Sequence, residues 1–312
     1  MKSICILLPC PPPTPNKAWG DWYFGNSLGK AFERLGIQTK YMFQHKKKKY
    51  QYFEGLKRHL ARNEADFVLR GKLAYKPIRG KPFFIWVISQ SSSLTDVELK
   101  QASHIFVASE FLANKWSKRG LPVTFVPQCT DAHIFSPDRR RTELATDVLF
   151  VGNRRSYAER PVVQMALDCN ANLTVWGRDW HGRLEKDIHK GEMIENSELG
   201  HHYASANVVI NDHTDDMLET GLVSNRIYDV LACGTAIVTE KMDSIPDDIK
   251  SGLYLYEDLK SFRQSLQDAQ DKSQQKQKMR LELANHIRQH HTFDTRAQVM
   301  LNIMKEVVSE KI

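Results

Sequence analysis

The sequence predicts an α/β protein built around two doubly wound parallel sheets. Short runs rich in β-branched and aromatic residues alternate with helical segments along both halves of the chain, as in parallel strands joined by crossover helices. Several runs are apolar throughout, which is typical of strands buried on both faces of a sheet. The 312 residues exceed one hydrophobic core of ordinary size, so about two domains of roughly 150 residues each are expected.

The first domain is expected over residues 1–140. Its first strand is Ile4–Leu8, and the segment GDWYFGN, residues 20–26, is predicted to lie in the connection between that strand and a helix. The helix has its apolar face over residues 28–35 and ends at Gly36. Further strands are predicted within residues 37–43, 65–71, 82–89, 102–109 and 122–128.

The second domain is expected over residues 141–312. Proline and charge in FSPDRRRTELATD, residues 135–147, indicate a boundary near residues 136–146. The tail from about Leu259 has a helical pattern rich in Gln, Lys and Arg, and it is expected to pack back toward the first domain. Strands are predicted within residues 147–152, 173–177, 207–212 and 235–240.

The composition is that of an ordinary globular protein. Hydrophobic residues make up 41% and charged residues 26% of the chain, which argues against a disordered or fibrous class. The net charge of +7 and the pI near 9.0 favour acidic partners such as nucleotides, anionic lipids or nucleic acid. Charge alone does not choose among these partners, and no further feature of the sequence favours nucleic acid.

The sequence favours a cytoplasmic protein. Its five cysteines include no CxxC pair, which indicates buried thiols in a reducing compartment. The start MKSICILLPCPPP, residues 1–13, suits a core strand better than a signal peptide. No run approaches the ~18 apolar residues of a membrane span. Any membrane contact is expected to be peripheral, at the inner face, through the basic segment Lys46 to Lys49, although such a charge run is usually a solvated loop.

One stretch, SNRIYDVLACGTAIVTE, residues 224–240, combines a cap, a short helix, a glycine and a buried strand. Ser224 or Asn225 is predicted to cap the helix, and Gly234 to end it. The first turn of such a helix offers backbone N–H groups and a positive dipole to an anion. Arg226 on that turn adds a guanidinium fork suited to phosphate oxygens.

Two further stretches accompany it: ASEFLANKWSKRGLPVTFVPQCTDAHIFSP, residues 108–137, and DVLFVGNRRSYAERP, residues 147–161. Together the three resemble the helix-strand signature, the interdomain stretch and the phosphate loop of GT-B glycosyltransferases, in particular the CgeB-like branch. The resemblance implies two Rossmann-like domains facing a central cleft, in which the second domain binds a nucleoside diphosphate sugar.

The resemblance also implies where the donor binds. Asp229 stands at the second of two glutamate positions eight residues apart, which contacts the donor's ribose, whereas Gly221 occupies the first. Arg226 is expected to stabilise the diphosphate. The other expected donor-binding residues lie at helix starts and at the carboxyl ends of strands: Gly152, Asn153, Arg160, Trp176, Gly177, Asn211, Asp212, Ser224 and Asn225. Arg154 and Arg155 could balance the diphosphate, and His213 is expected beside Asn211 and Asp212 at the donor sugar.

Asp21 is the candidate catalytic base or acceptor-orienting carboxylate of the first domain, with a helix cap as the competing interpretation. No metal site is predicted. The spacing of HIRQH, residues 286–290, lacks the glutamate of a zinc-protease helix, and Asp215 and Asp216 lack the context of a cation site. Arginines and a helix N-terminus account for diphosphate binding without a metal.

The predicted activity is metal-independent transfer of a sugar from a nucleoside diphosphate to a hydroxyl acceptor, with Asp21 and Arg226 as the catalytic residues. The acceptor is expected to be a cell-surface polysaccharide, a glycolipid or another glycan, and no cofactor is expected besides the nucleotide sugar as co-substrate. Two other classes stay open: a GT-B-type sugar-nucleotide epimerase, and a non-catalytic nucleotide- or glycan-binding protein. A DNA-modifying glycosyltransferase is a variant suggested only by the basic charge.

Overall fold

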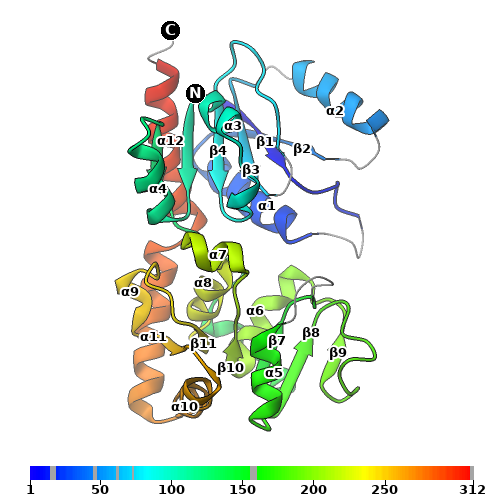
Figure 1. Ribbon diagram of the computed structural model, residues 1–312, viewed down its shortest axis with the longest axis vertical. Coiled ribbons are helices and arrows are strands. Elements are labelled where there is room, and N and C mark those ends of the chain that lie inside the picture. The colour runs from blue at the N-terminus through cyan, green and yellow to red at the C-terminus, as the bar shows by residue number, and fades with distance from the viewer. Residues whose placement is uncertain (15–18, 45–47, 61–62, 72–73, 155–159, 310–312) are drawn as a thin grey trace. The chain divides into compact units, whose positions relative to one another are not determined.

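The computed structural model describes residues 1–14, 19–44, 48–60, 63–71, 74–154 and 160–309 (Figure 1). Internal contacts divide the chain into two compact units. Unit 1 comprises Met1–Gln128, Asp215–Val223 and Phe293–Ile312, and unit 2 comprises Cys129–Thr214 and Ser224–Thr292. The predicted fold class, two doubly wound α/β sheets, is confirmed, because each unit contains one six-stranded sheet in which every pairing is parallel.

The sheet of unit 1 has the strand order β2-β1-β3-β4-β5-β6. Its strands are β1 (Ser3–Leu8), β2 (Gln38–Phe43), β3 (Ala65–Arg70), β4 (Phe83–Val87), β5 (His104–Val107) and β6 (Val123–Phe125). Its helices are α1 (Gly20–Arg34), α2 (Lys48–Leu60), α3 (Asp96–Gln101), α4 (Glu110–Ser117), α7 (Asp215–Thr220) and α12 (Phe293–Ser309). The final helix α12 packs on α1, where Arg34 donates two hydrogen bonds to the carboxylate of Asp294.

The start of α1 corrects one prediction. Residues 20–26 were expected to lie in the connection before the helix, but α1 begins at Gly20. The ring of Phe24 is buried against Trp86 and Phe293, with ring centroids 5.2 and 4.7 Å away. A Cβ at Gly25 would lie 2.3 Å from Leu8 Cδ2. Tertiary packing therefore extends the helix through a segment whose glycines and asparagine disfavour it locally.

The sheet of unit 2 has the strand order β12-β11-β10-β7-β8-β9. Its strands are β7 (Thr146–Val151), β8 (Leu173–Trp176), β9 (His189–Gly191), β10 (Ala206–Ile210), β11 (Ala236–Glu240) and β12 (Leu253–Tyr256). Its α-helices are α5 (Pro161–Asp168), α6 (Asn196–Ser205), α8 (Asn225–Ala232), α9 (Asp247–Lys250), α10 (Leu259–Ala269) and α11 (Gln274–His290). Short 3-10 helices occupy Ser91–Ser93 in unit 1 and Pro137–Arg139 and Thr142–Leu144 in unit 2.

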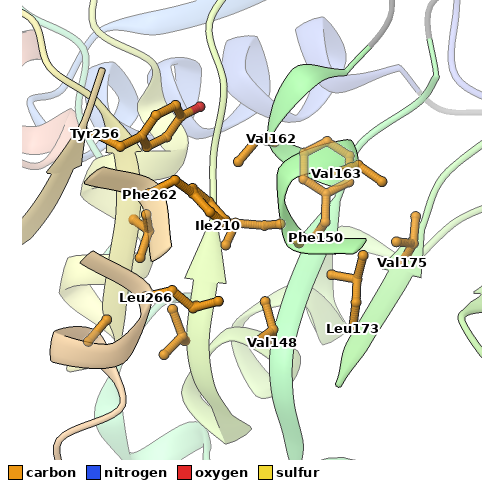
Figure 2. Packing of buried hydrophobic residues seen from close by; sticks show 14 of the residues in the cluster. Val148, Phe150, Val162, Val163, Leu173, Val175, Ile210, Tyr256, Phe262 and Leu266 are labelled. Atoms are coloured by element: carbon orange, nitrogen blue, oxygen red, sulfur yellow. The ribbon is translucent and has the colours of Figure 1, made fainter. Parts of the chain in front are cut away.

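The core of unit 2 lies between the sheet and the helices α5 and α10. Figure 2 shows Ile210 of β10 between Phe150 of β7 and Phe262 of α10, and all three side chains are fully buried. Burial of a side chain of this size contributes about 1.5–3 kcal/mol. Residues of the opposite parity, such as Leu149 and Val209, are also fully buried. The strands are thus covered on both faces, as their continuous hydrophobicity predicts.

Two edge strands were not predicted. β9 contains only His-Lys-Gly and pairs with β8 through an irregular register. β12 has the sequence Leu-Tyr-Leu-Tyr and pairs in parallel with β11. In the part of the chain that the structure describes, no helix is both long and apolar enough to cross a membrane.

Candidate functional site

The sheet of unit 2 reverses its winding between β7 and β10. These strands are adjacent, but the chain leaves β7 toward β8 on one side and leaves β10 toward β11 on the other. The carboxyl ends of the two strands, Val151 and Ile210, therefore flank a topological switch point, where open α/β sheets bind ligands. Most of the predicted donor-binding residues follow these two strands or lie on α8.

Arg226 spans this switch point. Its Nη1 donates to Asn211 Oδ1 at 2.7 Å, just after β10, and its Nη2 donates to the carbonyl of Val151 at 2.7 Å, at the end of β7. Both acceptors are neutral, and Arg226 forms no ion pair with any residue that the structure describes. The guanidinium is half-buried, so a positive charge is fixed at the switch point without a neighbouring carboxylate in contact.

Arg160 approaches the same aromatic ring from the loop before α5. The Cζ atoms of Arg160 and Arg226 each lie 5.5 Å from the centroid of the Phe150 ring, within the range of a cation–π interaction. Arg160 Nε donates to the carbonyl of Asn153 at 3.0 Å, and its Nη1 pairs with the buried carboxylate of Asp212. Of the two guanidinium groups, that of Arg226 therefore carries the less compensated charge.

The first turn of α8 begins as the sequence predicts. Ser224 is the N-cap, and its Oγ accepts from the N–H of Arg226 at 3.3 Å. The glycine stop is confirmed as well, since Gly234 has a φ of 70° and its N–H donates to the carbonyl of Leu231. Among the described residues, none accepts from the N–H of Asn225. That group remains available to an anion at the start of the helix.

The buried side chain of His213 positions this first turn of α8. From the sequence alone, His213 is expected only among the residues that follow β10. His213 Nε2 accepts from the backbone N–H of Ser224 at 3.1 Å. The proton of the ring is therefore on Nδ1, which lies 3.0 Å from Glu240 Oε2 at the end of β11. Glu240 Oε1 also accepts from the backbone N–H of His213. The spacing of Glu240 and His213 along the chain carries no signal of this contact.

Asn211 lies behind Arg226. It is fully buried, its Nδ2 donates to Thr239 Oγ1 at 2.9 Å, and its Oδ1 accepts from Arg226. Asp212, next to it, is buried in its pair with Arg160. Both residues thus orient the arginines in this structure. Their contact with the donor sugar stays a prediction.

The loop after β7, predicted to approach the phosphates, is bound to the loop after β8. The N–H of Gly152 donates to the carbonyl of Trp176, and the indole Nε1 of Trp180 donates to the carbonyl of Gly152, both at 2.8 Å. The N–H of Arg154 donates to the carbonyl of Arg178 at 3.0 Å. The backbone N–H groups of Gly152 and Arg154 thus already donate hydrogen bonds within unit 2. The cationic donors of the site are the arginine side chains. The candidate Arg155 lies outside the described residues.

Two glycines permit this close contact between loops. Gly177 has a φ of 149°, and a Cβ there would lie 2.1 Å from the carbonyl oxygen of Gly152. A Cβ at Gly152 would lie 3.0 Å from the Phe150 ring and 3.3 Å from Arg226 Nη2. Asn153 completes the contact, because its Oδ1 accepts from the N–H of Arg178. Gly152, Asn153 and Gly177 therefore shape the site through packing and loop geometry.

Trp176, at the end of β8, packs beside His202 and Gly191. Its half-buried ring meets His202 edge-on, with centroids 5.4 Å apart, and a Cβ at Gly191 would lie 2.6 Å from it. The predicted contact with the nucleotide base remains a prediction for this side chain.

Asp229 is buried under the first turn of α8. Its Oδ1 accepts from Thr130 Oγ1 at 2.7 Å, and its Oδ2 accepts from Asn225 Nδ2 at 2.9 Å. Burial raises the pKa of Asp229 to about 8, against the lowering effects of the Thr130 hydrogen bond and the Arg226 charge, while the charge of Asp131 raises it further. The sequence assigned this carboxylate to the ribose; the structure has both of its oxygens already bonded within unit 2.

Unit 1 has a switch point of its own between β1 and β3. The first connection runs from β1 to β2, whereas β3 leads to β4 on the other side. Asp21 lies at this edge in the first turn of α1, and a Cβ at Gly71, just after β3, would lie 4.0 Å from Asp21 Oδ1. Burial raises the pKa of Asp21 above its ordinary value, and burial together with the Asp21 charge raises the pKa of Cys10 to about 12.

The competing interpretation of Asp21 as a helix cap does not hold in its simple form. The N-cap residue is Trp19, and no side chain forms a cap hydrogen bond there. Asp21 stands two positions into the helix, where its charge still favours the helix dipole.

Residues 154–302 match the protein family described as glycosyl transferase-like. This range contains Arg160, Arg226 and most of the other predicted donor-binding residues. No curated protein matches the sequence. The family match does not distinguish the CgeB-like branch, which stays a prediction.

Solved structures share the fold over nearly the whole chain. Sucrose-phosphate synthase from Thermosynechococcus elongatus superposes with a TM-score of 0.66 at 12% identity, covering 99% of this chain and 100% of that chain. AviGT4, a glycosyltransferase involved in avilamycin A biosynthesis, gives 0.63 at 14% identity over 98% of each chain. A DNA-modifying β-glucosyltransferase, determined with and without uridine diphosphoglucose, gives 0.59 at 11% identity over 99% and 100%.

Proposed function

We propose that this glycosyltransferase of GT-B fold binds a nucleoside diphosphate sugar at the switch point of unit 2 and transfers the sugar to a hydroxyl acceptor. The observation that carries the proposal is the position of Arg226, whose guanidinium is held by the neutral oxygens of Val151 and Asn211. A fixed positive charge at a ligand-binding edge favours an anion, and a planar fork suits phosphate oxygens.

The two arginines would act mainly on the leaving group. When the bond between the anomeric carbon and the phosphate oxygen breaks, negative charge grows on the nucleoside diphosphate. Arg226 and Arg160 are already oriented by Asn211 and Asn153, so they stabilise that charge with little reorganisation. Because the charge is larger in the transition state than in the bound donor, the contribution appears chiefly in the rate.

The residues around the arginines act as positioning groups in this proposal. Asp229 holds Asn225 and His213 holds Ser224, so two buried side chains determine where α8 begins. The N–H of Asn225 would add one backbone donor for a phosphate oxygen. The ribose contact proposed for Asp229 requires a lone pair beyond the two that Thr130 and Asn225 occupy.

Unit 1 would present the acceptor, with Asp21 as the group that orients its hydroxyl and takes its proton. The acceptor oxygen then bonds to the anomeric carbon as the nucleoside diphosphate leaves, and the proton moves to the Asp21 carboxylate. A pKa raised by burial suits this role, since a stronger base accepts a proton more readily.

The acceptor class we favour is a glycan or a lipid-linked sugar, in the cytoplasm or at its membrane surface. Of the basic segment proposed for membrane contact, Lys46 and Lys47 lie outside the described residues, and the side chains of Lys48 and Lys49 are not described. Nucleic acid as acceptor would appear first as steep salt dependence of duplex binding.

A thermal-shift screen of nucleotides and sugar nucleotides tests donor binding. A ligand at 100 times its dissociation constant stabilises a protein by about 2.7 kcal/mol, so a cognate nucleotide gives a clear shift. Arg226→Ala should reduce the shift at the same concentration only partly, whereas Arg263→Ala, which removes an exposed arginine from α10, should leave it unchanged.

Activity assays with the nucleotide sugar found in that screen then distinguish a glycosyltransferase from an epimerase and from a binding protein. Release of free nucleoside diphosphate only in the presence of an acceptor supports transfer. Interconversion of sugar nucleotides without acceptor identifies an epimerase, and binding with neither reaction identifies a binding protein.

A further inference from the structure

A cluster of metal-ligand side chains lies in unit 2, apart from the arginines of the switch point. It consists of Asp248 on α9, His286 on α11 and His291 just after α11. The Nε2 atoms of His286 and His291 lie 2.9 and 2.7 Å from Asp248 Oδ2. Figure 1 shows α9 beside α11, which brings together residues 38 and 43 positions apart.

The three ligand atoms lie within 4.8 Å of one another. An ion with tetrahedral bonds of about 2.0–2.2 Å separates its ligand atoms by about 3.3 Å, so each imidazole would have to move from the carboxylate by only about half an ångström. The two N–H groups that now face Asp248 would be replaced by one ion, and each ring would bind it through the lone pair of Nε2 while carrying its proton on Nδ1.

The cluster combines an open side with a fixed side. The side chains of Asp248 and His286 are 46% and 36% exposed, whereas that of His291 is 9% exposed. An ion can thus reach the cluster from solvent and keep water as a further ligand, while His291 provides a rigid anchor. Partial burial works to raise the pKa of Asp248, but hydrogen bonds from His286 and His291 outweigh it and lower that pKa below its ordinary value.

We infer that Asp248, His286 and His291 form a binding site for a divalent transition-metal ion of the zinc class. Two imidazole nitrogens and one carboxylate oxygen suit zinc and its neighbours better than calcium or magnesium, which require mostly oxygen ligands. From sequence spacing alone, the pair of possible ligands on one helix face is His286 and His290, one helical turn apart on α11. Their ring centroids lie 4.7 Å from each other. The fold adds the aspartate and His291 from outside that helix.

A metal ion bound by Asp248, His286 and His291 would also stabilise α8, the helix that carries Arg226. The ring of His291 lies 5.5 Å from that of Tyr228 on α8. The carbonyl of His291 accepts from the N–H of Thr130, whose hydroxyl donates to Asp229. A bound ion would therefore stabilise α9, the end of α11 and α8 together. This role is structural, and it does not depend on the proposed sugar transfer.

The test uses the full chain without a histidine tag, freed of metal by dialysis against a chelator. Zn²⁺ is titrated by calorimetry, and Co²⁺ is followed by the visible absorption that imidazole and carboxylate ligation produces. We expect one equivalent of either ion to bind and the melting temperature to rise by several degrees with Zn²⁺. Absence of binding to the folded wild-type protein would overturn the inference, whatever the variants do.

Four substitutions separate the three-ligand site from simpler alternatives. Asp248→Asn and His286→Gln should each weaken Zn²⁺ binding at least tenfold and remove the melting shift. His290→Gln should leave both unchanged, as should His181→Gln, which alters an exposed histidine elsewhere in unit 2. If Asp248→Asn binds as the wild type does while His290→Gln loses the ion, the ligand is a two-histidine pair on α11 and the inference is wrong.

Discussion

The two units wind their sheets differently and place opposite chemistry at their switch points. Counted from its own first strand, the sheet of unit 1 has the order 2-1-3-4-5-6 and that of unit 2 has the order 3-2-1-4-5-6. At the switch point of unit 2, between β7 and β10, the guanidinium groups of Arg226 and Arg160 face the Phe150 ring. At that of unit 1, between β1 and β3, the polar group is Asp21, whose pKa is raised by burial. The parallel sheet determines where a ligand can bind, and the side chains after its strands determine whether that edge holds an anion or accepts a proton.

The largest effect is expected for the carboxylate of unit 1. Asp21→Asn keeps the shape but cannot accept a proton, so turnover should fall by roughly 10²- to 10⁴-fold. Donor affinity, which belongs to unit 2 in this account, should be unchanged. Steady-state kinetics with varied donor measures both quantities. If the variant keeps its turnover and instead melts at a lower temperature, Asp21 serves the helix and not the reaction.

The packing beneath the arginine site is tested by Gly177→Ala. The new Cβ would lie 2.1 Å from the carbonyl oxygen of Gly152 and 3.0 Å from the backbone nitrogen of Asn153, so this backbone must shift. Gly182→Ala is the matched control, because Gly182 also has positive φ, 71°, but has no atom within 4 Å of the added Cβ. Gly177→Ala should cost at least about 2 kcal/mol more than the control in urea unfolding. Equal losses would mean that the loop contact contributes no stability.

The buried carboxylate of Asp229 on α8 should give the stability of unit 2 a pH dependence of its own. Because the folded pKa of Asp229 is raised from 3.8 to about 8, the folded protein binds more protons than the unfolded chain between these values. Its free energy of unfolding should therefore fall as pH rises from about 4 to about 8 and level off above. Asp229→Asn removes this contribution.

Melting temperatures of the wild type and Asp229→Asn from pH 5 to 9 isolate that contribution. The difference between the two proteins should change steadily up to about pH 8, with the wild type losing more stability. A constant difference would show that Asp229 does not titrate in this range. Asp229→Ala, in contrast, leaves the donors of Thr130 and Asn225 without their acceptor and should cost about 1–3 kcal/mol.

The smallest effect is expected from a chelator. If the charge of the leaving group is stabilised by arginines, saturating EDTA should leave the turnover rate unchanged at a temperature well below melting. The melting temperature should fall where Asp248, His286 and His291 have taken up a metal ion. Loss of turnover that Mg²⁺ or Mn²⁺ restores would show that a metal at the donor, and not the protein, carries out this stabilisation.

The fold was largely predictable because its strands are continuous apolar runs between turn signals. Of the twelve strands in the described residues, ten overlap predicted segments, whereas β9 and β12 do not. The sequence His-Lys-Gly of β9 has no strand pattern and pairs only because β8 lies beside it. The early start of α1 was missed for a similar reason, since packing of Phe24 outweighs the local propensity of its neighbours.

The residues of the candidate donor site could be predicted from the sequence, but the hydrogen bonds between them could not. A helix start followed by Arg226 indicates an anion site from local sequence, and the strand-end position of Asn211 indicates the same edge. The partners of Arg226 lie 15 residues away at Asn211 and 75 residues away at Val151, and no local pattern indicates either hydrogen bond. The sequence assigned Asp229 to the donor's ribose and gave no sign of its hydrogen bond to Thr130, 99 residues earlier. A local motif such as a helix start with an arginine can be recognised in the sequence. Hydrogen bonds between residues far apart in the chain become visible only in the folded structure.

The central claim, that the guanidinium of Arg226 stabilises the departing diphosphate, is tested most directly by separating rate from binding in Arg226→Ala. Turnover is measured with saturating donor and acceptor, and the donor dissociation constant by calorimetry, with Arg263→Ala as the control. We predict that turnover falls by roughly 10²- to 10³-fold, as for loss of one transition-state donor, while the dissociation constant rises much less. A turnover equal to that of the control would contradict the account, whether or not donor affinity changes.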